Sequence, residues 1–213
     1  MSGPDLRWTS EPPDPAAVAL VLHGGAENSF HHVRWYFIAV QRLRPVAEAI
    51  ARAAGDDVAV VRLKFGVLGW NGDLASPIPD ARWALDRVRA TYPGTPIVVV
   101  GHSMGGRTAL QVAAEPDIAA VAALAPWVEP GDPVHAHPGE PFLLLHGTRD
   151  RITSLPETRR RGEMLRAAGA DATFEPVPWA GHAFVTTWRR THRRVGGWVA
   201  DVARGLPRPN RPS

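Results

Sequence analysis

The chain has 213 residues, no cysteine and a formal net charge of +3, and 45% of its residues are hydrophobic. This length allows one domain with a sizeable core. The absence of cysteine excludes disulfides, thiolate metal sites and a cysteine nucleophile. No apolar run approaches the roughly 20 residues that a membrane-spanning helix needs. The first residues lack the order of a signal peptide, so we expect a cytoplasmic protein without a membrane span.

The positive charge comes almost entirely from arginine, because Lys64 is the only lysine. Arginines gather at residues 159–161 and again at residues 189–194. Neither cluster is interleaved with an aromatic stacking platform. We therefore interpret both as solvated helix faces and expect no nucleic-acid partner.

Short apolar runs alternate with segments of helical spacing along the chain. Residues 1–15 contain four prolines, so we expect a mostly irregular segment with at most one short strand around residues 6–9. The predicted strands are residues 18–22, 58–63, 97–100, 118–124, 142–145 and 173–177. The predicted helices are residues 37–54, 78–91, 105–114, 156–168 and 188–204. Residues 205–213 are rich in proline and polar side chains and are predicted to form a disordered tail.

This alternation predicts an α/β fold. Residues 16–204 are expected to form a single domain around a doubly wound, mostly parallel sheet of about six or seven strands. In such a sheet, reactive groups collect at the carboxyl ends of the strands.

The segment Gly101-His102-Ser103-Met104-Gly105 directly follows an apolar run and leads into a predicted helix. It has the G-x-S-x-G pattern of a nucleophile elbow, in the strand-turn-helix context that gives the pattern its chemical meaning. The glycines on both sides of Ser103 let neighbouring segments of the backbone come close to the strained turn. An ordinary glycine-rich turn is the alternative, but the preceding strand favours Ser103 as a nucleophile.

An acid and a base can be sought where later strands end. Asp150 follows the run 141–147, and its carboxylate can accept a hydrogen bond from the N–H of an imidazole. The alternative is that it only caps a turn or a helix, as loop aspartates often do. Asp117 and Asp171 are weaker candidates, because each precedes a strand. His182 lies on a glycine-containing loop after the last strand, which completes the order serine, aspartate, histidine.

A tetrahedral oxyanion needs preorganised N–H donors. Met104, the residue after the nucleophile, supplies one amide. The turn after the first strong strand supplies the second, from Gly25 or Ala26. An ordinary glycine turn is the alternative interpretation of that segment.

Aromatic residues on strand-end loops are candidates for a substrate pocket. Trp127 and Phe184 are the best placed by position, and Trp70 and Phe30 are further candidates. Each of them singly could instead belong to the core.

The chain resembles the α/β-hydrolase family. The resemblance rests on the motifs His23-Gly24-Gly25, Gly101 to Gly106, His146-Gly147-Thr148-Arg149-Asp150 and Gly181-His182, and it covers about residues 16–200. It implies the hydrolase fold and a triad of Ser103, Asp150 and His182. Many members insert a helical cap at residues 126–140, but here this segment is a short proline-rich loop, so we expect no cap domain and an open site.

These observations together predict a serine hydrolase that cleaves a carboxylic ester of a small-molecule acyl or aryl substrate, with no metal or organic cofactor. A thioesterase or acyltransferase with the same triad is one alternative. A non-catalytic, hydrolase-like ligand-binding protein is an alternative of another class. The sequence leaves the oligomeric state open between monomer and homodimer.

Overall fold

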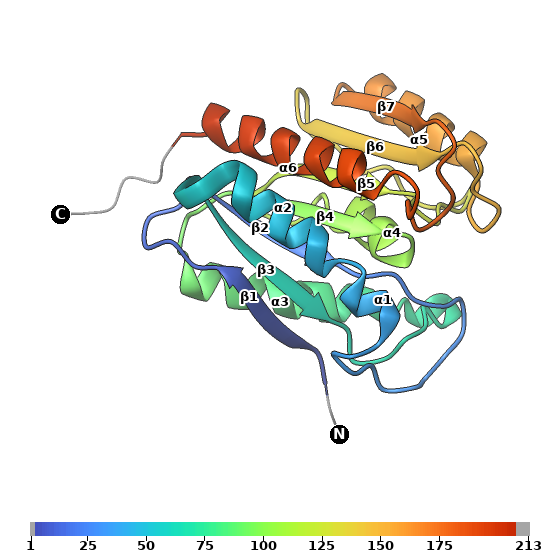
Figure 1. Cartoon of the computed structure of the whole chain (residues 1–213), viewed down its shortest axis with the longest axis horizontal. Coiled ribbons are helices and arrows are strands. Elements are labelled where there is room, and N and C mark those ends of the chain that lie inside the picture. Colours follow the sequence, from blue (N-terminus) through green and yellow to red (C-terminus); the bar gives the residue numbers. More distant parts are fainter. Residues whose placement is uncertain (1–2, 208–213) are drawn as a thin grey trace.

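The computed structural model describes residues 3–207. A seven-stranded sheet runs through the middle of the molecule, in the order β1-β3-β2-β4-β5-β6-β7 (Figure 1). Its strands are β1 Asp5–Ser10, β2 Ala17–Leu22, β3 Val58–Lys64, β4 Ile97–His102, β5 Ile118–Leu124, β6 Pro141–Gly147 and β7 Asp171–Val177. Strand β1 pairs antiparallel with β3, and every other neighbouring pair is parallel.

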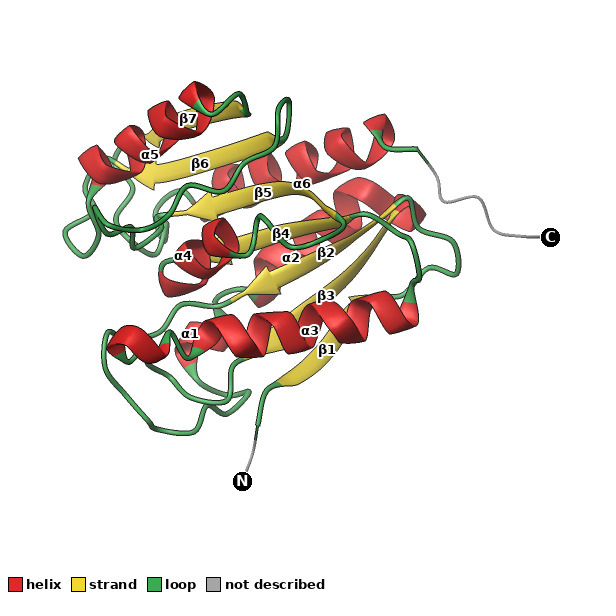
Figure 2. Cartoon of the chain, turned by 180° about the vertical axis from the view of Figure 1, so that it is seen from behind, coloured by secondary structure: helices red, strands yellow, loops and turns green. Residues whose placement is uncertain are grey.

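Helices cover both faces of this sheet. They are α1 Ile38–Gln41, α2 Arg44–Ala54, α3 Pro77–Thr91, α4 Met104–Gln111, α5 Leu155–Ala167 and α6 Trp188–Gly205, with short 3-10 turns η1 Gly55–Asp57 and η2 Gly72–Leu74. Helices α2 and α6 lie on one face (Figure 1), and α3, α4 and α5 lie on the other (Figure 2). The predicted doubly wound α/β fold is confirmed.

The core has two halves, one on each face of the sheet. In β2, Leu20 packs toward α3 and α4, whereas Val21 packs toward α2 and α6. All six residues of β2 are buried. This explains why the strand is an unbroken apolar run, because a parallel strand covered on both faces has no polar side.

The N-terminal segment is more regular than the sequence predicts. Residues 5–10 form β1, in which Leu6 lies opposite Leu63 and Trp8 lies opposite Val61. The prolines at positions 12 and 13 follow the strand and therefore do not interrupt its pairing. Of the predicted tail, residues 205–207 are described, with Gly205 ending α6, and residues 208–213 lie outside the described part of the chain.

The predicted helix over residues 37–54 is divided into α1 and α2. Pro45 is the second residue of α2. Proline has no N–H to donate and its ring collides with the carbonyl four residues earlier, so it is tolerated only in the first turn of a helix. A continuous helix through Pro45 is therefore excluded, and a new one starts beside it.

The connection between β5 and β6 contains no helix. A helical cap is therefore absent between these two strands, as the proline-rich sequence predicts. None of the helices in residues 3–207 is both long and apolar enough to cross a lipid bilayer.

Candidate active site

Ser103 occupies the turn between β4 and α4. Its backbone has φ 57° and ψ −119°, a conformation that side-chain-bearing residues rarely adopt. Hydrogen bonds hold it there: the Ser103 amide donates to the carbonyl of Leu124 at 2.9 Å, and the amide of Trp127 donates to the carbonyl of Ser103 at 3.1 Å. The turn therefore holds Ser103 at the carboxyl end of the central strand.

The three residues predicted as a triad lie in one chain of contacts. His182 Nε2 is 3.0 Å from Ser103 Oγ, and His182 Nδ1 is 2.9 Å from Asp150 Oδ2. Asp150 comes from the loop after β6 and His182 from the loop after β7. This geometry can pass a proton from the hydroxyl to the imidazole while the carboxylate stabilises the resulting positive charge.

The Asp150 side chain is completely buried and strongly bound. Oδ1 accepts from the amides of Ile152 at 2.8 Å and Thr153 at 3.1 Å, and Oδ2 accepts from the Thr153 hydroxyl at 2.9 Å. Burial alone would raise the pKa of this carboxyl. The contacts from His146, His182 and the two amides outweigh burial and hold the pKa well below its usual range, so Asp150 is a carboxylate.

A second histidine reaches the same carboxylate. His146 is fully buried, with Nε2 3.2 Å from Asp150 Oδ2 and Nδ1 2.8 Å from Thr158 Oγ1. Sequence reasoning placed His146 only in a motif that carries the resemblance and gave neither it nor Thr153 a role. A histidine at the end of a buried strand, four residues before the candidate acid, was the available signal.

His102 supports the loop that carries His182. Its Nε2 is 2.9 Å from the carbonyl oxygen of His182, and the two rings lie 4.8 Å apart. Burial, together with the nearby charge of His182, lowers the pKa of His102 to about 3. His102 is therefore neutral near pH 7 and donates to the His182 carbonyl through Nε2–H.

The amide of Ala26 is not available as an oxyanion donor. It donates to the carbonyl of Leu68 at 2.9 Å. In the described part of the chain, the amide of Gly25 makes no such bond, and Gly25 lines the cavity beside Ser103. Met104 begins α4, where the first amides have no partner within the helix. The two predicted donors that remain are Met104 and Gly25.

His23 supports the turn that carries Gly25. Its Nε2 accepts from the amide of Phe65 at 3.1 Å, so Nδ1 carries the proton and donates to the carbonyl of Gly24 at 2.6 Å. Burial lowers the pKa of His23 to about 4. A neutral imidazole thus links the turn to the strand end of β3.

The cavity beside Ser103 has a volume of about 260 Å³. It is lined by Gly25, Ala26, Glu27, Ser103, Met104, Trp127, Ile152 and Thr153. Of the four predicted pocket aromatics, only Trp127 lines this cavity. Trp70 lines a neighbouring cavity that shares Glu27 and Trp127 with it, and its ring packs edge-on against Trp127 at 6.2 Å.

The other two aromatic candidates lie elsewhere. Phe30 is 67% exposed and lines no part of the Ser103 cavity. Phe184 is buried in the half of the core beneath α2 and α6, with its ring 6.4 Å from that of His102. The order of residues in the chain does not show in which direction a loop side chain points. The prediction that Phe30 and Phe184 line the pocket is therefore wrong for this cavity.

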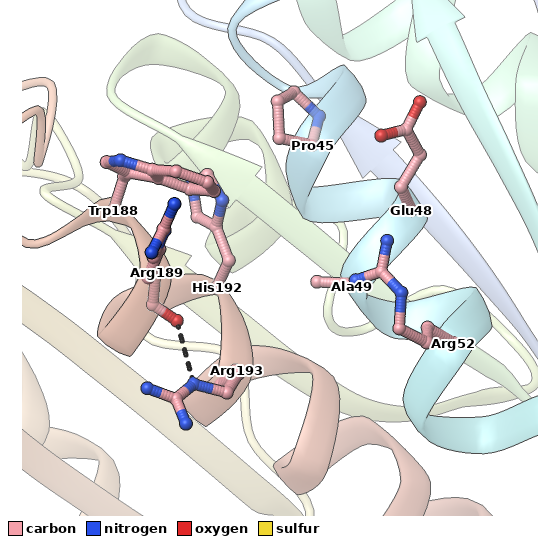
Figure 3. A pocket seen from close by; sticks show the side chains of 8 residues that line it. All are labelled: Pro45, Glu48, Ala49, Arg52, Trp188, Arg189, His192 and Arg193. Carbon is pink, nitrogen blue, oxygen red and sulfur yellow. Dashed lines mark hydrogen bonds between the residues drawn. The ribbon is translucent and has the colours of Figure 1, made fainter.

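A larger groove of about 630 Å³ lies between α2 and the start of α6 (Figure 3). It is lined by Pro45, Glu48, Ala49, Arg52, Trp188, Arg189, His192 and Arg193. None of these residues lines the cavity beside Ser103. The two helices touch at Gly196, where a β-carbon would lie 2.6 Å from the carbonyl oxygen of Ala49. The candidate active-site residue Ser103 thus lines the smaller cavity and not this groove.

The fold and the serine elbow together define an α/β hydrolase. The model of the alpha/beta hydrolase family matches residues 19–213, and the chain belongs to this family. Comparison with curated proteins found no match.

Solved structures share the fold at low identity. An α/β serine hydrolase without a lid from Xanthomonas campestris is 22% identical, with 97% of this chain and 91% of that chain covered and a TM-score of 0.66. An α/β serine hydrolase homologue from Coxiella burnetii is 16% identical, with 92% and 93% covered and a TM-score of 0.68. Est1E from Butyrivibrio proteoclasticus is 14% identical, with 93% of both chains covered and a TM-score of 0.68.

Proposed function

We propose that the protein hydrolyses carboxylic esters through an acyl-enzyme on Ser103. The observation that carries this proposal is the imidazole of His182, 3.0 Å from Ser103 Oγ on one side and 2.9 Å from the buried Asp150 carboxylate on the other. A serine hydroxyl is a weak nucleophile unless a base takes its proton during attack.

In the first half of the reaction, Ser103 Oγ forms a bond to the ester carbonyl carbon while its proton moves to His182 Nε2. The carbonyl oxygen becomes an oxyanion, which accepts hydrogen bonds from the backbone amides of Met104 and Gly25. The tetrahedral intermediate then collapses. The bond to the alcohol oxygen breaks, and His182 returns the proton to the departing alcohol.

In the second half, water attacks the acyl carbon and gives its proton to His182 Nε2. The bond from the acyl carbon to Ser103 Oγ breaks, the acid leaves, and Ser103 regains its proton. Asp150 keeps the proton of His182 on Nδ1 in the resting state, so that Nε2 is free to act as the base. No bond of this cycle forms or breaks on Asp150.

The proposed substrate is a small or medium acyl or aryl ester. A cavity of about 260 Å³ with Trp127 on its wall suits one short chain or one ring beside the serine. The connection between β5 and β6 adds no cap above it. The rest of the substrate therefore extends into solvent or into the neighbouring cavity at Trp70.

The test is the hydrolysis of short p-nitrophenyl esters by the wild type and by S103A. We expect S103A to lose activity by roughly a thousandfold or more, with an unchanged circular dichroism spectrum. S10A, in β1 at the sheet edge, is the matched control and should keep wild-type activity. Undiminished hydrolysis by a folded S103A protein would contradict the proposal, and product analysis with added alcohol would separate hydrolysis from acyl transfer.

A further inference from the structure

His146 is a buried imidazole that the acyl-transfer steps leave unused. Its side chain is 0% exposed and it lies at the end of β6. Nε2 is 3.2 Å from Asp150 Oδ2, and Nδ1 is 2.8 Å from Thr158 Oγ1. The two ring nitrogens thus face two different buried oxygens, and the position of the proton decides what His146 does.

A proton on Nδ1 alone is unfavourable. Nε2 would then present its lone pair to a carboxylate oxygen 3.2 Å away. The Asp150 side chain is 0% exposed, so water does not screen this repulsion. The neutral form with the proton on Nδ1 is therefore disfavoured.

Thr158 is compatible with the two remaining forms. Its hydroxyl has one proton and lies 2.8 Å from His146 Nδ1 and 3.2 Å from the carbonyl oxygen of Ser154. If the hydroxyl donates to Nδ1, the neutral ring carries its proton on Nε2. If it donates to the Ser154 carbonyl, Nδ1 must be a donor and the ring is the cation, with a proton on both nitrogens. In both forms Nε2 carries a proton.

We propose that His146 is a positioning residue that holds the Asp150 carboxylate toward His182. Its Nε2–H faces Oδ2, the same oxygen that accepts from His182 Nδ1 and from the Thr153 hydroxyl. This role rests on the proposed function of Ser103.

The contact between His146 Nε2 and Asp150 Oδ2 acts mainly through electrostatic attraction and not through a well-aligned hydrogen bond. Nε2 makes no well-aligned hydrogen bond in the described part of the chain, so its proton lies off the axis toward Oδ2. Such a contact still stabilises the carboxylate in a buried site. With Oδ1 held by the amides of Ile152 and Thr153, the carboxylate has little freedom to rotate away from His182.

The first test does not depend on catalysis. Nitrogen-15 NMR of histidine-labelled protein distinguishes the tautomers of an imidazole, and H146Q assigns the His146 signals by their loss. We expect a proton on Nε2 of His146 in the wild type. A neutral ring with its proton on Nδ1 would overturn the inference, and this result is independent of whether Ser103 turns over any ester.

The second test compares H146L with H146Q. Leucine removes the donor, whereas the glutamine amide can present an N–H close to the position of Nε2. We expect H146L to lower kcat roughly tenfold with little change in KM, and H146Q to recover most of that loss. H31Q, at an exposed histidine, is the control and should behave as wild type.

The pH profile separates positioning from mere packing. Without the His146 donor, the Asp150 charge is less neutralised and attracts the protonated form of His182 more strongly. The acid limb of kcat/KM should therefore move to higher pH in H146L and return in H146Q. Wild-type kcat and an unmoved acid limb in H146L would overturn the inference.

T158V covers the case in which H146L does not fold. Valine is close to threonine in shape and removes only the hydroxyl that partners Nδ1. We expect a smaller loss of kcat and a smaller shift of the acid limb in the same direction. A folded T158V protein with kcat and the acid limb both unchanged would contradict the role of His146, and so would an equal loss of kcat in folded H146L and H146Q proteins.

Discussion

Gly101 and Gly105 lie so close that a β-carbon on Gly101 would be 2.0 Å from the carbonyl oxygen of Gly105. A β-carbon on Gly105 would in turn be 2.5 Å from the carbonyl oxygen of His23. These approaches let α4 begin directly above the end of β4, with Ser103 at the tip of the turn. The glycines of the elbow are thus a steric condition for the position of Ser103.

The substitution G101A should destabilise the protein by several kcal/mol, because the new methyl group must displace backbone. Urea unfolding measures this loss. G197A is the matched control, since a β-carbon there meets nothing within 4 Å. Alanine in a helix should stabilise by up to about 1 kcal/mol relative to glycine. Equal unfolding midpoints for G101A and the wild type would contradict this account of the elbow.

Much of the fold, and the close approach of the three candidate residues, could be predicted because their signals are local in sequence. The apolar runs indicate the strands, and Ser103, Asp150 and His182 lie in the turn or loops that follow three of them. Ala26 is excluded as an oxyanion donor, because its amide donates a hydrogen bond to the carbonyl of Leu68. That bond joins two loops far apart in the chain, so the sequence does not indicate it. The contacts of His146 with Asp150 and Thr158 and the burial of Phe184 likewise depend on side-chain directions, which spacing does not specify.

Replacing Asp150 with asparagine should lower kcat by roughly a thousandfold or more, because asparagine can donate to Nδ1 and favour the wrong tautomer of His182. KM should change little, since Asp150 does not line the cavity. Steady-state kinetics with a short p-nitrophenyl ester measures both values. D171N, at the exposed start of β7, is the control. An active D150N protein would show that another acid orients the histidine.

The protein should lose stability in acid through His23 and His102. Burial lowers both pKa values, to about 4 and about 3, from an ordinary value of 6.5. A lowered histidine pKa means that the folded state binds its proton less readily than the unfolded state. This contribution is present in full above pH 6.5 and is lost as the pH falls toward the folded values.

Urea midpoints measured across this range test the effect. The wild type should become steadily less stable below pH 6.5, and H102Q should show a shallower slope because one of the two groups is missing. H31Q should follow the wild type. A slope that H102Q leaves unchanged would show that other groups cause the acid sensitivity.

W127A should raise KM for short esters roughly tenfold, because Trp127 forms part of the wall of the cavity beside Ser103. Its effect on kcat should be smaller. F30A should leave both values unchanged, since Phe30 is exposed and lies outside that cavity. A larger KM change in F30A than in W127A would show that the substrate contacts Phe30 and does not bind in this cavity.

The most direct test of the central claim is covalent labelling with a fluorophosphonate probe, followed by mass spectrometry of the peptides. The wild type should gain one adduct, on Ser103, because the probe reports a serine whose hydroxyl is activated by a base. S103A should remain unlabelled although folded, and D150N should react more slowly. A folded wild type that gains no adduct, or one on another residue, would contradict the claim that Ser103 is the nucleophile.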